Sequence, residues 1–231
     1  MAHTHDFIAL IPARGGSKGI QRKNLRDLAG KPLLHHTVDA ACGSRHICDI
    51  YLSSEDDEIL MSGKAAGCKT IRRPVALAQD DSAATDVVLD FFEQATLFGD
   101  PFIVYLQPTS PLRTSTHIDT AIDAMAAAGA DSLVSVMELE KSPFKSFVCG
   151  EDGRLKSLFE ENYSNHNRQQ LPKAYIPNGA LYIFRKSLFM ARSGFPSDGS
   201  LPYIMSQTDS VDIDSEDDLI RAGQIMEQRN D

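Results

Sequence analysis

Residues 7–19 have the sequence FIALIPARGGSKG, and this stretch decides the expected fold. Its first five residues form an apolar run that ends at Pro12, which is typical of a strand buried on both faces of a parallel sheet. The glycines that follow allow backbone N–H groups to approach an anion without obstruction by a Cβ atom. A buried strand that leads directly into such a loop predicts an α/β protein with an anion-binding loop at the carboxyl end of a strand.

Basic residues gather in the same region. Between Arg14 and Lys31 there are six basic residues and one acidic residue, although the whole chain has a net charge of −9. The overall charge argues against general nucleic-acid binding, whereas the local cluster suits a small polyanion such as a nucleoside triphosphate. We expect Arg14, Lys18 and Lys23 to neutralise the phosphates, Arg14 through its bidentate guanidinium. A solvated basic helix face is the alternative, and the framing glycines and apolar strand argue against it.

Strand and helix patterns alternate along most of the chain. Apolar runs predict further strands at 50–53, 68–71, 102–106, 132–136 and 180–184. Helical spacing of apolar residues predicts helices at 32–42, 56–66, 86–97 and 116–128. A last helix is expected after Ser215, a natural N-cap. The alternation predicts a doubly wound, mostly parallel, Rossmann-like sheet in a single domain that comprises residues 1–231.

Residues 140–175 interrupt this alternation. They are rich in Lys, Asn, Gln, Ser and Pro, with scattered Phe and Tyr. Long segments of this kind inside a compact domain usually serve a function. We expect an excursion from the sheet that acts as a lid or as a dimerisation arm.

Two aspartates near the C-terminus are candidates for a metal site. Asp212 and Asp214 are separated by Ile213, so on an extended segment both carboxylates project to the same side. Two carboxylates beside a triphosphate are suited to Mg²⁺, with Mn²⁺ as a possible substitute. The alternative is an acidic first turn of the last helix, which fits Asp212 poorly.

The segment from Gln107 to Arg113 has the sequence QPTSPLR and follows a predicted buried strand. Fixed turns that carry polar side chains are typical of a shelf that recognises a base or a sugar. Turn chemistry alone is the alternative explanation.

Several classes of protein are excluded by composition. No apolar run reaches the roughly 20 residues that a membrane-spanning helix needs. The N-terminal segment lacks the layout of a secretory signal, so a cytoplasmic protein is expected. The four cysteines lack the paired spacing of a zinc site, which favours buried or free thiols.

Four stretches resemble the acylneuraminate cytidylyltransferase family, whose members are also called CMP-sialic acid synthetases. The stretches are IPARGGSKGIQRKN, LQPTSPLR, RQQLPKAYIPNGALYI and YIMSQTDSVDID, which extend in the family's order from about Phe7 to Ala222. The resemblance implies a nucleotidyltransferase fold and the transfer of CMP from CTP to the anomeric 2-hydroxyl of N-acetylneuraminic acid, or of a close nonulosonic acid. It also implies a homodimer in which the partner's excursion helps to build the sugar site.

The resemblance further implies a role for individual residues. Those expected to be catalytic are Arg14, Lys23 and Asp214, and Asp212 and Asp214 are the expected metal ligands. Residues expected to bind the nucleotide are Arg14, Gly15, Gly16, Ser17, Lys18, Lys23, Asn24, Arg73, Ser82 and Thr85. Residues expected to line the sugar pocket are Gln107, Lys145, Arg168, Tyr182 and Phe195.

Two positions depart from the family's pattern. Ala84 replaces a hydroxyl residue that relatives often carry near the cytosine, although Ser82 and Thr85 flank it. Ile176 replaces an Arg that often precedes the Pro-Asn-Gly turn, which makes N,N'-diacetyllegionaminic acid an alternative substrate. Pseudaminic acid and an eight-carbon acid remain more distant alternatives. A catalytically silent nucleotide-binding protein is the alternative from another class.

Overall fold

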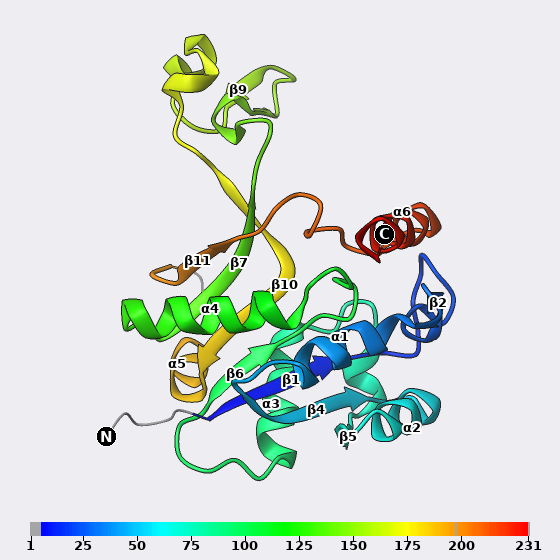
Figure 1. Cartoon of the computed structure of the whole chain (residues 1–231). Helices are drawn as coiled ribbons and strands as arrows, with labels where there is room; N and C mark the ends of the chain where they lie inside the picture. The colour runs from blue at the N-terminus through cyan, green and yellow to red at the C-terminus, as the bar shows by residue number, and fades with distance from the viewer. Residues whose placement is uncertain (1–5, 197, 231) are drawn as a thin grey trace.

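A computed structural model describes residues 6–196 and 198–230 and contains a central seven-stranded sheet (Figure 1). The order of its strands is β11-β7-β10-β6-β1-β4-β5, and β10 runs antiparallel to both of its neighbours while the other pairs are parallel. The predicted mostly parallel sheet is therefore confirmed. The strands are β1 (Phe7–Pro12), β4 (Ile47–Ser54), β5 (Lys69–Arg72), β6 (Phe102–Tyr105), β7 (Ser132–Glu138), β10 (Tyr175–Arg185) and β11 (Leu201–Ile204).

Helices cover both faces of the sheet. Side chains of β1 alternate between two cores: Ala9 and Ile11 pack with α1 and α4, and Ile8 and Leu10 pack with α3 and α5. Because every β1 residue between Phe7 and Pro12 is thus buried, the strand tolerates only apolar side chains. The helices are α1 (Leu33–Cys42), α2 (Asp57–Ala65), α3 (Ala84–Gln94), α4 (Ser115–Ala128), α5 (Lys186–Arg192) and α6 (Glu216–Asn230).

A third apolar core lies beside the basic loop and fixes its position. Ile20 of that loop packs with Leu28 in the short hairpin of β2 (Asp27–Leu28) and β3 (Lys31–Pro32). Ile213 and Leu219, next to and within α6, belong to the same core. Segments about 190 residues apart in the sequence are thereby held together at one edge of the molecule.

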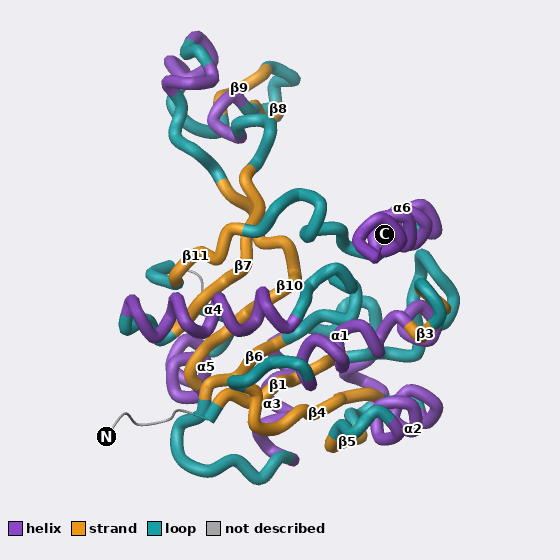
Figure 2. The backbone as a smooth tube through the Cα atoms, in the orientation of Figure 1, coloured by secondary structure: helices purple, strands orange, loops and turns teal. Residues whose placement is uncertain are grey.

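Residues 139–174 form a projection that stands away from the sheet between β7 and β10 (Figure 2). It contains a hairpin of β8 (Phe147–Cys149) and β9 (Leu155–Ser157) and three short 3₁₀ helices: Pro143–Lys145, Glu161–Asn165 and Arg168–Gln170. The projection exposes apolar side chains, among them Phe147, Leu155, Leu158 and Phe159. That it acts as a lid or a dimerisation arm stays a prediction.

Among the described residues, no helix combines the length and apolar character that crossing a bilayer requires. The four cysteines are free thiols, and Cys68 is buried, as expected. Residues 1–5, which make up most of the N-terminal segment considered for a secretory signal, lie outside the described residues.

Candidate active site

A pocket of about 280 Å³ opens where β1 and β6 end, at the carboxyl edge of the sheet. The basic loop forms one wall of it and the segment after β6 forms another. Its lining includes most of the residues predicted to bind the nucleotide: Arg14, Gly16, Ser17, Lys23, Asn24, Arg73 and Ser82. The predicted sugar residue Gln107 also lines this pocket, as do Ala84 and Tyr105.

The carboxylate of Glu55 joins the basic loop to Arg73 next to the pocket. Oε1 of Glu55 accepts the backbone N–H of Gly15 at 2.7 Å, and Oε2 accepts Nη2 of Arg73 at 3.1 Å. The N–H of Gly15 is therefore already bonded, and Gly16 and Ser17 are the loop residues that line the pocket. Sequence reasoning missed Glu55, because its partners come from segments that only the fold brings together.

Arg73 is a buried cation with a free donor. Its side chain is 4% exposed, and among the described residues Nε has no hydrogen-bond partner. A buried donor without a partner is costly to the folded state. The side chain lines the pocket together with Tyr105, whose pKa is raised by burial although the charge of Arg73 acts in the opposite direction.

The loop cations Arg14 and Lys18 face the opposite rim of the pocket. Nη1 of Arg14 donates to the carbonyl of Gln79 at 2.9 Å, and Nη2 lies 3.0 Å from Asp80. Nζ of Lys18 also lies 3.0 Å from Asp80. Asn24 supports the loop from behind, since its Nδ2 donates to the carbonyl of Arg14 at 2.8 Å.

Lys23 joins the basic loop to the acidic pair. Its Nζ donates to the carbonyl of Ile213 at 2.6 Å and lies 3.1 Å from Oδ1 of Asp214. Gly19 allows the same approach, because a Cβ atom there would lie 2.1 Å from the carbonyl oxygen of Asp214. The fold therefore brings the two predicted halves of the site into direct contact.

Asp212 and Asp214, the predicted metal ligands, lie close enough for their charges to interact. Loss of hydration raises the pKa of Asp212, and the charge of Asp214 acts in the same direction, while a hydrogen bond from Thr109 and the charge of Lys23 oppose the shift. Asp212 is nevertheless exposed to solvent. Two exposed carboxylates close enough to repel one another suit Mg²⁺, with phosphate and water completing its ligands. Among the described residues, no group of three His, Cys, Asp or Glu forms a site from protein ligands alone.

Arg113 holds the predicted shelf from below. It is 2% exposed, and its Nη1 donates to the carbonyls of Gln107 and Ala180 at 3.1 and 3.0 Å. Burial lowers its pKa to about 9. Gly179 has a φ of 76°, and a Cβ atom there would lie 2.4 Å from Oε1 of Gln107. The shelf is therefore packed against the Pro-Asn-Gly turn. Arg113, the last residue of the predicted shelf segment, supports that segment from inside the protein.

The two residues that flank Ala84 have different positions. Ser82 lines the pocket, but its hydroxyl accepts the N–H of Gln79 at 2.9 Å and donates to the carbonyl of Ala76 at 3.0 Å. Thr85 lies in the first turn of α3 and faces Gly194. The hydroxyl of Ser82 thus shapes the rim of the pocket.

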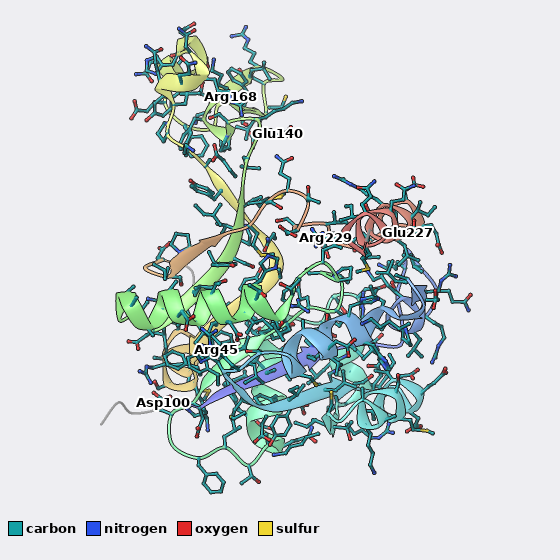
Figure 3. The ribbon with its side chains drawn as sticks, in the orientation of Figure 1. Arg45, Asp100, Glu140, Arg168, Glu227 and Arg229 are labelled. Atoms are coloured by element: carbon teal, nitrogen blue, oxygen red, sulfur yellow. The ribbon has the colours of Figure 1, made fainter. Side chains whose placement is uncertain are left out.

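The predicted sugar residues fall into two groups. Tyr182 and Phe195 form an aromatic cluster with Tyr105, with ring centroids 5.0 to 6.2 Å apart, next to the pocket that Tyr105 lines. Lys145 and Arg168 are exposed on the projection, and Figure 3 shows Arg168 far from the sheet. The pocket and the projection of one chain are therefore separate.

Comparison with known proteins decides the family. The model of the cytidylyltransferase family matches residues 8–225 of the chain. The chain belongs to the cytidylyltransferase family. N-acylneuraminate cytidylyltransferase of Streptococcus agalactiae is 33% identical to it over 215 residues, which is 92% of this chain and 51% of that protein. The enzyme of the same name from Escherichia coli is 31% identical over 224 residues, 97% of this chain and 53% of that protein.

The chain spans about half the length of the two relatives named above, at 51% and 53%. Other proteins match it along nearly their whole length. CMP-N,N'-diacetyllegionaminic acid synthase of Legionella pneumophila is 33% identical over 230 residues, which is 96% of each protein. Among solved structures, a CMP:2-keto-3-deoxy-manno-octonic acid synthetase complexed with CTP has a TM-score of 0.71 at 16% identity, covering 97% of this chain and 99% of that one. That likeness confirms the nucleotidyltransferase fold.

Proposed function

We propose that this chain transfers CMP from CTP to the anomeric 2-hydroxyl of a nonulosonic acid and releases pyrophosphate. The observation that carries this proposal is the contact of Lys23 with Asp214, which joins the basic loop to the acidic pair of Asp212 and Asp214. A protein that only binds a nucleotide does not need both halves. The names of the relatives from Streptococcus, Escherichia and Legionella support the same reaction.

The reaction is an in-line displacement at the α-phosphorus of CTP. The sugar oxygen forms a bond to that phosphorus while the bond to the bridging oxygen of pyrophosphate breaks, and the hydroxyl proton is released. Such a transfer depends mainly on positioning and on neutralisation of charge. Arg14 and Lys23 line the pocket with fixed positive charge, and the buried guanidinium of Arg73 lies beside them.

Asp212 and Asp214 would hold Mg²⁺, for which Mn²⁺ is a possible substitute. When bound, the ion supplies positive charge for the phosphates and the leaving pyrophosphate. These two carboxylates would set the position of the ion. The segment that carries them is itself held in place, because the carbonyl of Thr109 accepts the N–H of Ile213 at 2.8 Å. This contact ties the acidic pair to the shelf that also carries Gln107.

We propose N-acetylneuraminic acid or a close relative as the acceptor sugar. A second candidate is N,N'-diacetyllegionaminic acid, and Ile176 favours it. Ile176 lies on β10 opposite Met137 of β7 and is 42% exposed. It therefore presents an apolar side chain at the position where the family often has the charged side chain of an Arg. The full-length match to the Legionella synthase supports the same candidate.

We propose that the protein acts as a cytoplasmic homodimer. Lys145 and Arg168 are exposed on the projection, remote from the pocket of their own chain. A partner's projection placed over that pocket would bring both cations to the carboxylate of the sugar. The exposed apolar side chains Leu155 and Leu158 of the projection fit an interface between two copies.

The experiment that tests the function is release of pyrophosphate from CTP and Mg²⁺ with a panel of sugars. The panel contains N-acetylneuraminic, N,N'-diacetyllegionaminic and pseudaminic acids. We expect release with one of the first two. Absence of release with every sugar, in protein that binds CTP, would support the silent nucleotide-binding alternative.

A further inference from the structure

Asp80 forms ion pairs with Arg14 and Lys18, two cations of the basic loop that the sequence predicts to bind the phosphates. Its Oδ1 lies 3.0 Å from Nη2 of Arg14, and its Oδ2 lies 3.0 Å from Nζ of Lys18. Each carboxylate oxygen thus has one cationic partner. The hydrogen bond from Lys18, and then the nearby charges, hold the pKa of Asp80 below its usual range, so the group is an anion at neutral pH. Its own segment adds a second acceptor for Arg14, the carbonyl of Gln79.

This arrangement imitates the binding of a phosphate group. A carboxylate presents two oxygens to a guanidinium and an ammonium in much the same geometry as phosphate does. A phosphate that took the same donors would bring two anions within a few ångströms of each other, and like charges at that distance repel. Asp80 and a phosphate group would therefore compete for Arg14 and Lys18.

We propose that Asp80 is an internal counter-ion that competes with CTP and with pyrophosphate for Arg14 and Lys18. The proposal rests on the function proposed above. In it, Asp80 is a positioning residue: it weakens the grip of the loop on polyphosphates and re-forms its ion pairs as pyrophosphate leaves. Product release is thereby favoured at the expense of affinity for the substrate.

The local structure allows this exchange without a change in the fold. Asp80 is in the turn between the 3₁₀ helix Val75–Ala78 and α3, and its side chain is 43% exposed. The turn is closed by Ser82, whose hydroxyl bonds to Gln79 and Ala76. Side-chain rotation of Asp80 and Lys18 is therefore enough to free the cations, since the side chain of Lys18 is 81% exposed.

The test is the affinity of the full chain for pyrophosphate and for CTP, measured by calorimetry, in wild type and Asp80→Asn. Asparagine keeps the shape and removes the charge. Exposed ion pairs are weak, so we expect a dissociation constant about 2- to 10-fold lower for each ligand in Asp80→Asn. Product inhibition by pyrophosphate should strengthen by the same factor, and KM for CTP should fall while kcat does not rise.

Asp81→Asn is the matched control. Asp81 is adjacent and exposed, and it forms no ion pair with any residue in the described part of the chain. This variant removes the same charge and should leave both affinities unchanged. An equal gain in both variants would show a general charge effect and overturn the proposal. Unchanged or weaker binding of pyrophosphate and CTP by Asp80→Asn would overturn it as well. So would a failure of wild type and Asp80→Asn to bind pyrophosphate.

The proposed function can fail separately. If wild type binds CTP but no sugar in the panel gives pyrophosphate, the cytidylyl-transfer proposal fails. The comparison of Asp80→Asn with Asp81→Asn by calorimetry still decides the role of Asp80, because it requires binding and no turnover.

Discussion

Asp212 and Asp214 are the residues that we propose hold a cation, and their surroundings bring the two carboxylates together. Ile213 between them is fully buried, which fixes the backbone and leaves both carboxylates on one side. Dehydration and the charge of Asp214 raise the pKa of Asp212. The protein thus keeps two like charges close together, an arrangement that disfavours the folded state and is relieved by a bound cation.

We expect Asp212→Asn to separate activity from stability. The variant should lower kcat about 100-fold or more, because one of the two carboxylates proposed to hold the metal is lost. It should leave the melting temperature unchanged or raise it, because repulsion from Asp214 disappears. Steady-state kinetics and thermal unfolding of the same sample test this. A large loss of stability with kcat preserved would show that Asp212 is structural.

Glu55 is expected to stabilise the floor of the pocket. In Glu55→Ala, buried Arg73 loses its carboxylate partner and Gly15 loses its acceptor, which should cost about 3 kcal/mol of unfolding free energy. Affinity for CTP should fall with it. Urea denaturation and calorimetry measure the two effects.

Glu58→Ala serves as the control for Glu55→Ala. Glu58 is paired with Arg22 at 2.6 Å, but its side chain is 72% exposed. Exposed pairs contribute about 0–1 kcal/mol. Equal destabilisation by the two variants would contradict the role assigned to Glu55.

The sequence predicts residues whose signal lies within one segment. Arg14, Lys23 and Asp214 belong to segments with an unusual local pattern, and the structure places all three around one site. Glu55 lacks such a signal. Its partners Gly15 and Arg73 come from distant segments that only the packing of the fold brings together, so no local pattern distinguishes Glu55 from an ordinary charged residue.

At the scale of elements, helix starts were predicted well where a side chain caps them. Asp56 accepts the N–H of Ile59 at 3.0 Å before α2, and Ser215 accepts that of Asp218 at 3.3 Å before α6. Helix α3 has no side-chain cap; it begins at Ala84 and ends at Gln94, whereas the predicted helix covered 86–97. Strand β11 was not predicted, because it is short, contains Pro202 and is partly exposed.

The contact of α1 with the β2–β3 hairpin is expected to depend on pH. Burial lowers the pKa of His36, whose Nε2 lies 2.8 Å from the carbonyl of Leu28. In the unfolded chain the imidazole of His36 binds a proton near pH 6.5, whereas in the folded protein it binds one only at lower pH. The unfolding free energy should therefore fall as the pH drops below about 6.5, and level off below the folded-state pKa.

His36→Gln keeps a donor for Leu28 but does not titrate. The variant should show a smaller loss of unfolding free energy between pH 7 and pH 5 than wild type, as measured by urea denaturation. His117, whose pKa is also lowered by burial, accounts for part of the remaining slope. Identical slopes for the two proteins would contradict a contribution from His36.

At the scale of the whole molecule, the projection and the pocket are expected to work in different subunits. We expect Arg14→Ala and Arg168→Ala each to be inactive as pure proteins. In a mixture that has exchanged subunits, half of the dimers should carry one intact site. About a quarter of wild-type activity should therefore return.

Subunit exchange is followed by native mass spectrometry of the mixture. Activity that returns in step with the mixed dimer supports a site shared between subunits. If mixed dimers form and no activity returns, Arg168 acts within its own chain, whereas full activity of pure Arg168→Ala would show that it has no role in the site.

The central claim is that the site beside the ends of β1 and β6 catalyses transfer of the cytidylyl (CMP) group of CTP to a sugar. Phosphorus NMR of the full chain with CTP, Mg²⁺ and N-acetylneuraminic or N,N'-diacetyllegionaminic acid tests it most directly. We predict one new phosphodiester resonance and an equal amount of pyrophosphate, with both absent in Asp214→Asn. Formation of CDP and inorganic phosphate, or no change in CTP with either sugar, would contradict the account.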